Sequence, residues 1–204
     1  MKNANKHTEN LKSLLKKLTR EGKPEPKQAV DPLRALVTGI LTFEAPAGRP
    51  EAAMEIVDRE FVDLNELRVA TELEVIEIIG PKYPAIELRA LMFREILNAI
   101  FEKEHTLSFE RIKTLGKKDA RAALREMPDM TPFVEAYTLM FGLDSAAAPI
   151  DQWMLDLLTE AEAVEPGTSI EEAQKFVESH LKSEELYDFY ALVRRAAGAK
   201  KAKV

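Results

Sequence analysis

The sequence predicts an all-α protein. Apolar residues recur three and four positions apart in one segment after another, the spacing that gives a helix one apolar face. Residues that cap helix N-termini precede several of these segments, and no segment shows the sustained alternation of apolar and polar residues that indicates a strand. With 204 residues, of which 46% are hydrophobic, the chain can form one domain or two lobes that share it.

The first part of the chain contains four expected helices. Four leucines within residues 11–18 form one apolar stripe, and the proline-containing stretch 22–27 indicates a linker. Asp31-Pro32 places an N-cap and a first-turn proline at the start of the next helix. Thr71 and Glu74 form a capping box, the reciprocal pairing of a helix-start hydroxyl and a carboxylate three residues later. Further helices are expected at 50–60 and 71–79.

Helix-start signals continue along the rest of the chain. Asp151 caps one helix, and the following helix begins at a capping box formed either by Thr168 and Glu171 or by Ser169 and Glu172. These signals leave short connections, as expected for packed helices. The remaining helices are expected at 84–104, 108–115, 118–126, 132–141, 170–181 and 184–197, with a turn at 127–130 and a loop at 142–150.

The composition excludes several kinds of chemistry. The chain has no cysteine, so disulfides, thiolate metal sites, iron–sulfur clusters and cysteine nucleophiles are excluded. His7, His105 and His180 lie on different segments, no two of them four residues apart, and we therefore expect no metal site. Glycine-rich phosphate-binding loops and the serine hydrolase motif are missing as well, so we expect no cofactor.

The sequence also gives no indication of a membrane. Its apolar runs stay well below the roughly 18 residues that span a bilayer. The N-terminal stretch 1–17 lacks the apolar core and the small-residue cleavage site of a secretory signal. We therefore expect a soluble cytoplasmic protein with no membrane among its partners.

Charge is distributed unevenly along the chain. The net charge is −6, which by itself disfavours a nucleic acid partner. Residues 1–28, 111–125 and 194–203, however, each carry a net charge of +5 and together hold 19 of the 29 Lys and Arg residues. A local basic face on an acidic body is compatible with DNA binding. For the two terminal segments the alternative is a solvated tail, which we consider the better interpretation.

One stretch carries a family resemblance. A helix ending in Leu124-x-x-Met127-Pro128, a tight turn and a second helix with an apolar face are followed by Phe141-Gly142 and Pro149-Ile150-Asp151. This order resembles the helix-hairpin-helix (HhH-GPD) region of the endonuclease III-like DNA glycosylases. Phe133 and Asp151 are 18 residues apart, which is similar to the family's spacing between its catalytic lysine and aspartate.

The resemblance extends over most of the chain. Residues 31–42 are similar to the first core helix of the family, and residues 61–69 resemble a sequence segment found in several of its branches. The resemblance implies an all-α, bilobal glycosylase-like fold. We expect three regions: a basic N-terminal helix and linker at 1–28, the HhH-GPD-like helical domain at 29–197 and a basic tail at 198–204.

The chain departs from the family pattern at functional positions. Asp129 and Thr131 replace the two hairpin glycines, so the backbone can approach a phosphate less freely and Asp129 adds a repelling charge. Phe133 occupies the position of the Schiff-base lysine, which removes lyase chemistry by the family route. Trp153 stands where a histidine commonly follows the aspartate. The cluster cysteines are missing.

Asp151 is the catalytic residue that the resemblance implies. In the family this carboxylate lies at a helix N-terminus beside the extruded nucleotide, where it activates water and stabilises positive charge on the sugar. Monofunctional relatives that remove alkylated purines keep it and carry an aromatic residue at the lysine position, a pattern that Phe133 fits. The alternative is that Asp151 only caps its helix, a role worth about 1 kcal/mol.

Other residues are candidates for DNA contact. Glu44 is either a wedge beside a flipped base or a solvent-facing loop residue, and Thr131 lies in the hairpin. Phe133 and Trp153 could line a base pocket or belong to the core, whereas Tyr137 and Phe141 are expected in the core. The candidates for phosphate contact are Lys113, Lys117, Lys118, Arg121 and Arg125, with a solvated helix face as the alternative.

The sequence thus favours a DNA-binding protein of base-excision repair. DNA is the expected partner, and binding should be salt-sensitive because Lys and Arg must replace the altered hairpin glycines. Whether the chain is an enzyme stays open between a monofunctional DNA N-glycosylase without lyase activity and an inactive DNA-binding or protein-interaction module. An unrelated helical scaffold is a third interpretation.

Overall fold

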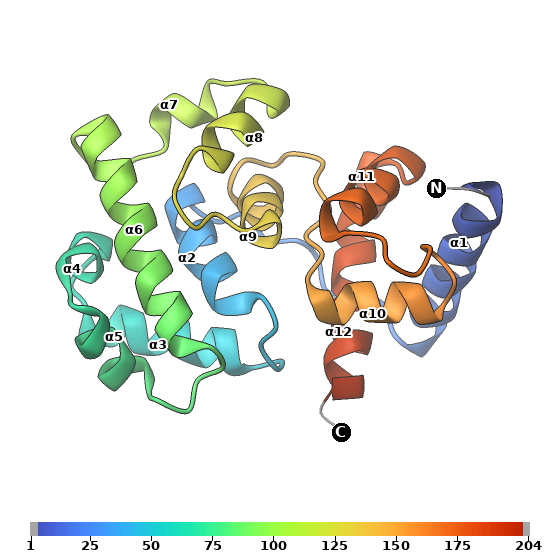
Figure 1. Ribbon diagram of the computed structural model, residues 1–204, viewed down its shortest axis with the longest axis horizontal. Coiled ribbons are helices and arrows are strands. Elements are labelled where there is room, and N and C mark those ends of the chain that lie inside the picture. The colour runs from blue at the N-terminus through green and yellow to red at the C-terminus, as the bar shows by residue number, and fades with distance from the viewer. Residues whose placement is uncertain (1–3, 202–204) are drawn as a thin grey trace.

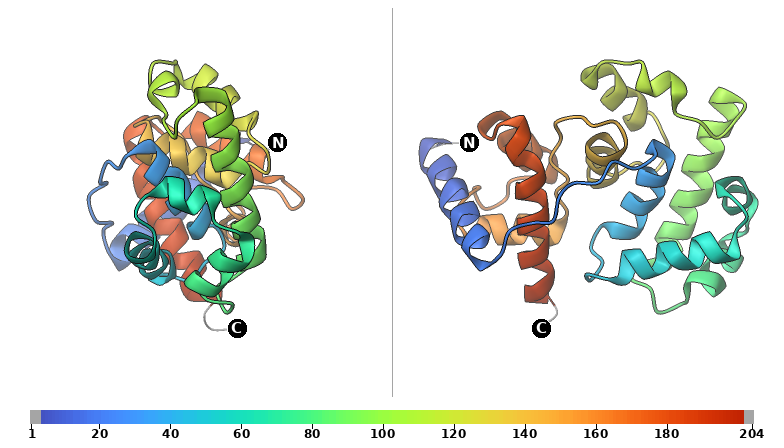
Figure 2. Two further views of the ribbon diagram at one scale, coloured as in Figure 1. Left: turned by 90° about the vertical axis from the view of Figure 1, so that its left-hand side faces the viewer. Right: turned by 180° about the vertical axis from the view of Figure 1, so that it is seen from behind.

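The computed structural model describes residues 4–201, which form two helical lobes along the longest axis of the molecule (Figure 1). One lobe is continuous in sequence, and the other joins the N-terminal helix to the last three helices. The linker 22–31 runs between them across α12 (Leu186–Lys201), as the view from behind shows (Figure 2), and the Tyr187 hydroxyl donates to the Glu25 carbonyl at 2.9 Å. No strand occurs within residues 4–201, and the all-α, bilobal prediction is confirmed.

The continuous lobe is built around α2 and the long helix α6. Helix α6 packs against α2, α4 and α5, and α2 packs against α9 and η1. The elements of this lobe are α2 (Pro32–Thr42), α3 (Arg49–Glu60), α4 (Leu64–Val69), α5 (Glu72–Ile79), α6 (Ile86–Glu104), α7 (Glu110–Lys113), α8 (Lys117–Arg125), α9 (Pro132–Tyr137) and the π-helix η1 (Thr138–Gly142).

The second lobe is built around α12, which packs against both α10 and α1. Its elements are α1 (Ala4–Glu21), α10 (Gln152–Glu160), α11 (Ile170–His180), the 3-10 turn η2 (Ser183–Glu185) and α12. None of the helices within residues 4–201 combines the length and the apolar character that a membrane span requires.

Two glycines allow α2 to approach α9 and η1 closely. A Cβ atom on Gly142 would lie 2.6 Å from the Pro32 Cα atom. Because Pro32 Cα belongs to the backbone, no side-chain movement could relieve this clash. A Cβ atom on Gly39 would lie 3.1 Å from the Tyr137 ring. Gly142 thus packs on the N-terminal end of α2, and Gly39 brings Tyr137 against its C-terminal half, so the helix that leads into the loop to the second lobe is held along its length.

The predicted helix starts are present. Asp31 Oδ1 accepts the backbone N–H groups at the start of α2, and the Thr71 capping box is formed at α5. At α11 the capping box is the one made by Ser169 and Glu172. Thr168 does not form the alternative box, because its hydroxyl donates to the Glu165 carbonyl at 2.7 Å.

Helices α4 and η1 differ from the sequence expectations. Helix α4 was not expected, because it has only six residues and buries one side chain, Leu67. The single helix expected at 132–141 widens into η1, where the Thr138 hydroxyl donates to the Val134 carbonyl at 2.8 Å and competes with regular helix hydrogen bonding. The helix expected at 108–115 is reduced to α7.

The terminal segments are packed helices, and the solvated-tail interpretation is wrong for the residues described. Leu11 and Leu18 of α1 are buried, at 0% and 5% exposure. Helix α12 continues to Lys201, where Lys201 and Lys200 pair with carboxylates of α10. The remaining tail residues, 202–204, lie outside the described part of the chain. The division of the chain at residues 28 and 197 stays a prediction.

Candidate active site and nucleic-acid interface

The hairpin consists of α8, a turn and α9. Asp129, in the turn, has φ +54°. The left-handed backbone conformation that a glycine would adopt here is therefore kept, although the residue is an aspartate. An aspartate tolerates this conformation better than most residues because its short side chain hydrogen-bonds locally. The Thr131 hydroxyl caps α9 by accepting the Val134 N–H at 3.2 Å. The hairpin backbone thus keeps a glycine-like turn, and what differs is the added side chain and its charge.

Asp151 lies where the two lobes meet, at the N-terminus of α10. Its side chain is 3% exposed, and both oxygens accept backbone N–H groups: Oδ1 from Met154 and Oδ2 from Glu44, each at 2.9 Å. Arg194 Nη1, from α12, lies 3.8 Å from Oδ2. The carboxylate therefore joins the loop after α2, the start of α10 and α12.

The loop that reaches Asp151 is held from two sides. Glu44 has φ +47°, and Arg194 donates to the neighbouring Ala45 carbonyl at 3.2 Å. From the other side, Arg89 donates to the carbonyls of Phe43 and Pro84, each at 2.6 Å, and to that of Ile40. The Ile40 and Phe43 carbonyls lie at the end of α2, where carbonyls lack helical partners, and the guanidinium satisfies them. Two arginines thus fix the backbone N–H that Asp151 accepts.

Arg89 is wholly buried, at 0% exposure, and its donors go to carbonyls rather than to a carboxylate. Its guanidinium lies over the rings of Phe43 and Tyr83, 4.1 and 5.3 Å from their centroids. Burial lowers the pKa of Arg89 to about 10. The sequence analysis did not predict a role for this residue. The one feature that could have indicated it is a cation among apolar residues near the start of the long helix.

Glu44 is half-buried rather than a solvent-facing loop residue. Burial raises the pKa of its carboxyl group, the Asp151 charge adds to this, and the Gln152 backbone N–H opposes it by donating to the Glu44 carboxylate. Glu44 and Asp151 therefore share the N-terminus of α10. The wedge role of Glu44 stays a prediction.

Phe133 belongs to a cluster of aromatic rings between α9, η1 and α12. Its ring is 3% exposed and lies 5.9 Å from that of Tyr137 and 6.4 Å from that of Tyr190. Tyr137 stacks on Phe141 at 4.3 Å, and burial raises the pKa of Tyr137 to about 12. Trp153, on α10, is half-buried at the edge of the core. A base could reach Phe133 only if this cluster opened.

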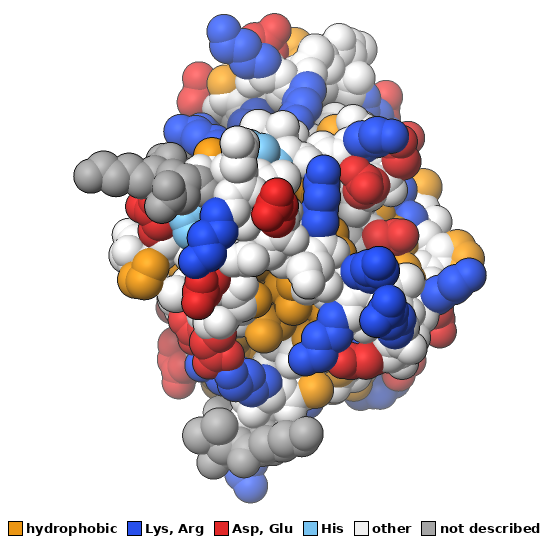
Figure 3. All heavy atoms as spheres, turned by 90° about the vertical axis from the view of Figure 1, so that its right-hand side faces the viewer, with side chains coloured by type: hydrophobic (Ala, Val, Ile, Leu, Met, Phe, Trp, Pro, Cys, Tyr) orange, Lys and Arg blue, Asp and Glu red, His pale blue; other side chains and the backbone are white. Residues whose placement is uncertain are grey.

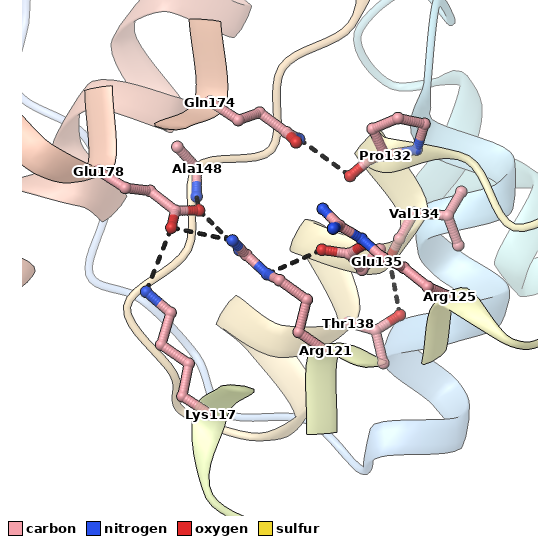
Figure 4. A network of polar contacts seen from close by, with 10 residues as sticks. All are labelled: Lys117, Arg121, Arg125, Pro132, Val134, Glu135, Thr138, Ala148, Gln174 and Glu178. Carbon is pink, nitrogen blue, oxygen red and sulfur yellow. Dashed lines mark hydrogen bonds and ion pairs between the residues drawn. The ribbon is translucent and has the colours of Figure 1, made fainter. Parts of the chain in front are cut away.

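Three of the four basic residues of α8, Lys117, Arg121 and Arg125, point toward carboxylates of the neighbouring elements (Figure 4). Arg121 contacts Glu135 at 2.8 Å and Glu178 at 2.6 Å. Lys117 lies 3.2 Å from Glu178, and Arg125 pairs with Glu135. Glu178 also accepts the Ala148 N–H at 3.1 Å. We call Lys117, Arg121, Arg125, Glu135 and Glu178 the α8 network; it joins α8, α9, α11 and the loop before α10.

The two carboxylates of the α8 network differ in depth. The Glu135 side chain is 1% exposed and that of Glu178 is 11% exposed. Burial raises the pKa of Glu135, and Arg125 and Arg121 offset this only in part. For Glu178 burial has the same direction, but Arg121 and Lys117 outweigh it and the pKa is lowered. The two groups also differ in their other neighbours: the Ala148 N–H further lowers the pKa of Glu178, whereas the nearby Glu178 charge further raises that of Glu135.

The remaining phosphate-contact candidates are on the surface. Lys113 pairs with Glu110 at 2.5 Å, one turn away. Lys118 is exposed and makes no ion pair with any residue within 4–201. Helix α1 lies at the opposite end of the molecule from α4 and α5 (Figure 1), and the face at that end carries many Lys and Arg side chains (Figure 3). Among the cations of α1, Lys12, Lys16 and Arg20 are exposed. The assignment of DNA-contacting residues stays a prediction.

A hollow of about 480 Å³ between the start of α1 and α11, beside Lys175 and His180, is not lined by the predicted site residues. Asp151 is instead enclosed by the loop after α2 and by α12. Within residues 4–201, no group of three or more His, Asp and Glu side chains is arranged to hold a metal ion.

Comparison with known proteins identifies the fold. No protein-family model and no curated protein sequence matches the chain. Solved structures do match. The 8-oxoguanine glycosylase/lyase of Clostridium acetobutylicum, in complex with DNA, superposes with a TM-score of 0.74 and 18% identity over 100% of this chain and 72% of its own.

Two further structures agree. Endonuclease III trapped on DNA matches with a TM-score of 0.72 and 11% identity, over 95% of this chain and 85% of its own. The 3-methyladenine DNA glycosylase of H. pylori, bound to 1,N6-ethenoadenine, matches with a TM-score of 0.68 and 16% identity, over 97% of this chain and 98% of its own. The chain therefore has the helix-hairpin-helix fold of the endonuclease III-like DNA glycosylases.

Proposed function

We propose that this chain is a DNA-binding protein of base-excision repair that hydrolyses the N-glycosidic bond of a damaged nucleotide without lyase activity. The observation that carries the proposal is the position of Asp151: a carboxylate at a helix N-terminus, between the two lobes of a glycosylase fold. The structures with this fold include an 8-oxoguanine glycosylase/lyase and endonuclease III, both bound to DNA, and a 3-methyladenine DNA glycosylase bound to 1,N6-ethenoadenine.

The chemistry uses Asp151 as base and as counter-charge. A water oxygen bonds to C1′ of the deoxyribose while the bond from C1′ to the base nitrogen breaks, and the departing base takes the electron pair. The water proton passes to the Asp151 carboxylate. The same carboxylate stabilises the positive charge that develops on the sugar, because its N–H partners orient it without supplying a formal charge.

Access to Asp151 requires one local movement. Oδ2 faces the loop after α2, and withdrawal of this loop breaks the hydrogen bond from Glu44 while the cap from Met154 to Oδ1 remains. Glu44 would then lie beside the extruded nucleotide, in the wedge position. Phe133 and Trp153 would line the base pocket. Since Phe133 has no amine, no Schiff base can form at this position.

DNA would lie across the hairpin. Lys118 is available for a phosphate, Lys113 is exposed on α7, and Thr131 lies at the start of α9. Lys117, Arg121 and Arg125 could contribute only by exchanging Glu178 or Glu135 for a phosphate. Binding should therefore weaken steeply with salt, since each phosphate contact contributes about 0.9 to the logarithmic salt slope.

The alternative is a catalytically inactive protein of the same fold that acts as a DNA-binding or protein-interaction module. One observation favours it: Asp151 is 3% exposed, and both of its oxygens already accept hydrogen bonds within the protein. In that case Asp151 is a structural residue.

Base release from duplexes that carry alkylated, deaminated or oxidised bases distinguishes the two. We expect release by the wild type, loss of release in Asp151→Asn with DNA affinity retained, and no change in Asp156→Asn, a matched carboxylate on the same helix. Borohydride should not trap the protein on abasic DNA, because Phe133 occupies the lysine position. If the wild type binds DNA and releases no base, the inactive module is the correct interpretation.

A further inference from the structure

Three aliphatic side chains at the α4–α5 end of the molecule lie in solvent. Val62, Val69 and Leu73 are 93%, 64% and 72% exposed. Val62 precedes the N-cap of α4, where an apolar residue often packs against the fourth residue of the helix. That residue, Leu67, is buried in the core at 1% exposure and does not cover Val62. The fold therefore gives these aliphatic groups no partner.

Val69 also lines a hollow of about 290 Å³ formed by the end of α3 together with α4 and α5. Phe61, Ala70 and Ile78 supply the rest of an apolar floor. Three carboxylates, those of Glu60, Glu66 and Glu74, stand around the same hollow. An apolar floor with an anionic rim is the combination that accepts the methylene stem and the charged head of Lys or Arg.

Two of the rim carboxylates are held in place by the protein itself. Glu66 accepts the Val62 N–H, and Glu74 accepts the N–H and the hydroxyl of Thr71, at 2.7 and 2.8 Å. These Thr71 donors lower the pKa of Glu74. In each case the hydrogen bonds go to Oε2, which leaves Oε1 for a further donor. The rim is ordered before any partner arrives.

The charge of this end is strongly negative. Residues 49–80 carry nine Asp or Glu and three Lys or Arg, a net charge of −6 that equals the net charge of the whole chain. DNA and anionic membrane surfaces are repelled by such a field, whereas a basic protein segment is attracted. The exposed aliphatic groups on this acidic end add an apolar contact surface to the electrostatic attraction.

We infer that the hollow between α3, α4 and α5 is a docking site for a basic amphipathic segment of a partner protein. Aliphatic side chains of that segment cover Val62, Val69 and Leu73, and its ammonium or guanidinium groups reach Glu60, Glu66 and Glu74. Helices α4 and α5 lie at the end of the molecule opposite α1, and the hairpin lies between these ends (Figure 1), so the partner and DNA can bind together. The inference does not depend on catalysis by Asp151.

The test uses the full chain and two fluorescein-labelled synthetic peptides. The first is a helical peptide of Leu and Lys with one apolar face, and the second has Ser in place of every Leu at the same charge. The first should bind, and the second should bind at least tenfold more weakly. The variant Val69→Ser/Leu73→Ser should lose at least tenfold in affinity for the first peptide, and Glu60→Lys should lose several-fold.

The controls are Leu88→Ser, an exposed aliphatic on α6 at 44% exposure, and Glu184→Lys, an exposed acid of the second lobe. Both should bind like the wild type, and all four variants should keep the wild-type melting temperature because the changed groups are exposed. Equal affinity of Val69→Ser/Leu73→Ser and wild type overturns the inference. A peptide-free dimer that this variant dissociates, seen by sedimentation, also overturns it by making a second copy the occupant.

Discussion

The molecule buries carboxylates in two regions that differ in what holds them. Around Asp151, the donors are the backbone N–H groups of Met154 and Glu44. The nearest cation is farther away, with Arg194 Nη1 3.8 Å from Asp151 Oδ2. In the α8 network, Glu135 and Glu178 receive side-chain cations directly. Backbone donors orient a carboxylate and leave its charge uncancelled, whereas ion pairs cancel the charge and join elements. The first arrangement suits chemistry on a developing cation, and the second suits cohesion.

The largest effect is expected in the α8 network. Arg121→Met should lower the free energy of unfolding by about 3 kcal/mol, the lower end of the range for breaking a buried ion pair, because the Arg121 side chain is 17% exposed and water can partly replace it. Within residues 4–201, the variant leaves Glu135 with Arg125 and leaves Glu178 with Lys117 and the Ala148 N–H. Urea unfolding measures the difference.

Lys118→Met is the matched control for this prediction, since it removes an unpaired cation from the same helix. It should change the free energy of unfolding by less than about 0.5 kcal/mol. If both variants are equally stable, the network does not hold the hairpin to α11. Its cations would then be available for phosphates without a structural cost.

A smaller effect is expected at Asp151. From the sequence alone, we expect Asp151→Asn to change the free energy of unfolding very little, because Asn and Asp are similar N-caps. The structure changes this expectation: both oxygens accept N–H groups, and an amide must turn its NH₂ toward one of these donors. Asp151→Asn should therefore lower the free energy of unfolding by about 1–3 kcal/mol, the cost of an unpaired buried donor, as measured by urea unfolding.

Asp31→Asn provides the contrast. At the start of α2 a single oxygen, Asp31 Oδ1, accepts both N–H groups, from Leu33 and from Arg34. An amide oxygen can do the same, so this variant should match the wild type. If Asp151→Asn is as stable as Asp31→Asn, Oδ2 is not essential to the junction of the lobes, and the loop after α2 opens at little cost.

These two regions also show what sequence can predict. The caps at Asp31, Thr71 and Ser169 were predictable because their donors lie within three residues of the acceptor. The partners of α8 were not, since Arg121 and Glu178 are 57 residues apart and helical periodicity does not say which helices meet.

Around Asp151 the limit was similar. Sequence analysis predicted the cap of α10, while the contact from Glu44 spans 107 residues. Tyr190, within the aromatic cluster at 6% exposure, gave no signal in a helix of mixed composition. Family resemblance supplied Asp151 and the hairpin as candidates, but a resemblance does not report burial. The groups that enclose the Asp151 carboxylate come from distant parts of the chain, so its burial could be seen only in the folded structure.

A third, smaller effect concerns pH within the α8 network. The pKa of Glu178 is lowered in the folded state, so its contribution to stability is present above the ordinary pKa of 4.5 and is lost as the pH falls through the folded value. The pKa of Glu135 is raised, mainly by burial, so its contribution changes in the opposite sense and offsets part of that loss. Glu135→Gln should therefore lose stability more steeply on acidification than the wild type.

The added slope should be a fraction of the about 1.4 kcal/mol per pH unit that one proton represents. Urea unfolding across the acid range measures it. Glu110→Gln, which removes an exposed acid paired with Lys113, should leave the slope unchanged. An unchanged slope in Glu135→Gln would mean that the burial of Glu135 is fully compensated by its arginines.

The smallest effect on stability is expected in the hairpin turn, where DNA affinity is the sensitive measurement. Asp129 already adopts the left-handed conformation that a glycine would have, at φ +54°. Asp129→Asn keeps tolerance for this conformation and removes the charge, whereas Asp129→Gly also removes the Cβ atom. Either should change the free energy of unfolding by no more than about 0.5 kcal/mol. If Asp129 faces a phosphate, removing its charge relieves a repulsion of about 1 kcal/mol, so Asp129→Asn should raise duplex affinity about fivefold at low salt.

Comparison of the two Asp129 variants separates charge from steric access. Equal gains would assign the whole effect to charge, and a larger gain for Asp129→Gly would show that the side chain also keeps the backbone from the phosphate. Asp144→Asn is the control, because Asp144 is another acidic loop residue with positive φ, 45°, outside the hairpin. If neither Asp129 variant changes affinity while Lys118→Glu weakens binding, DNA contacts α8 without contacting the turn. The fold would then have kept the hairpin as a structural element only.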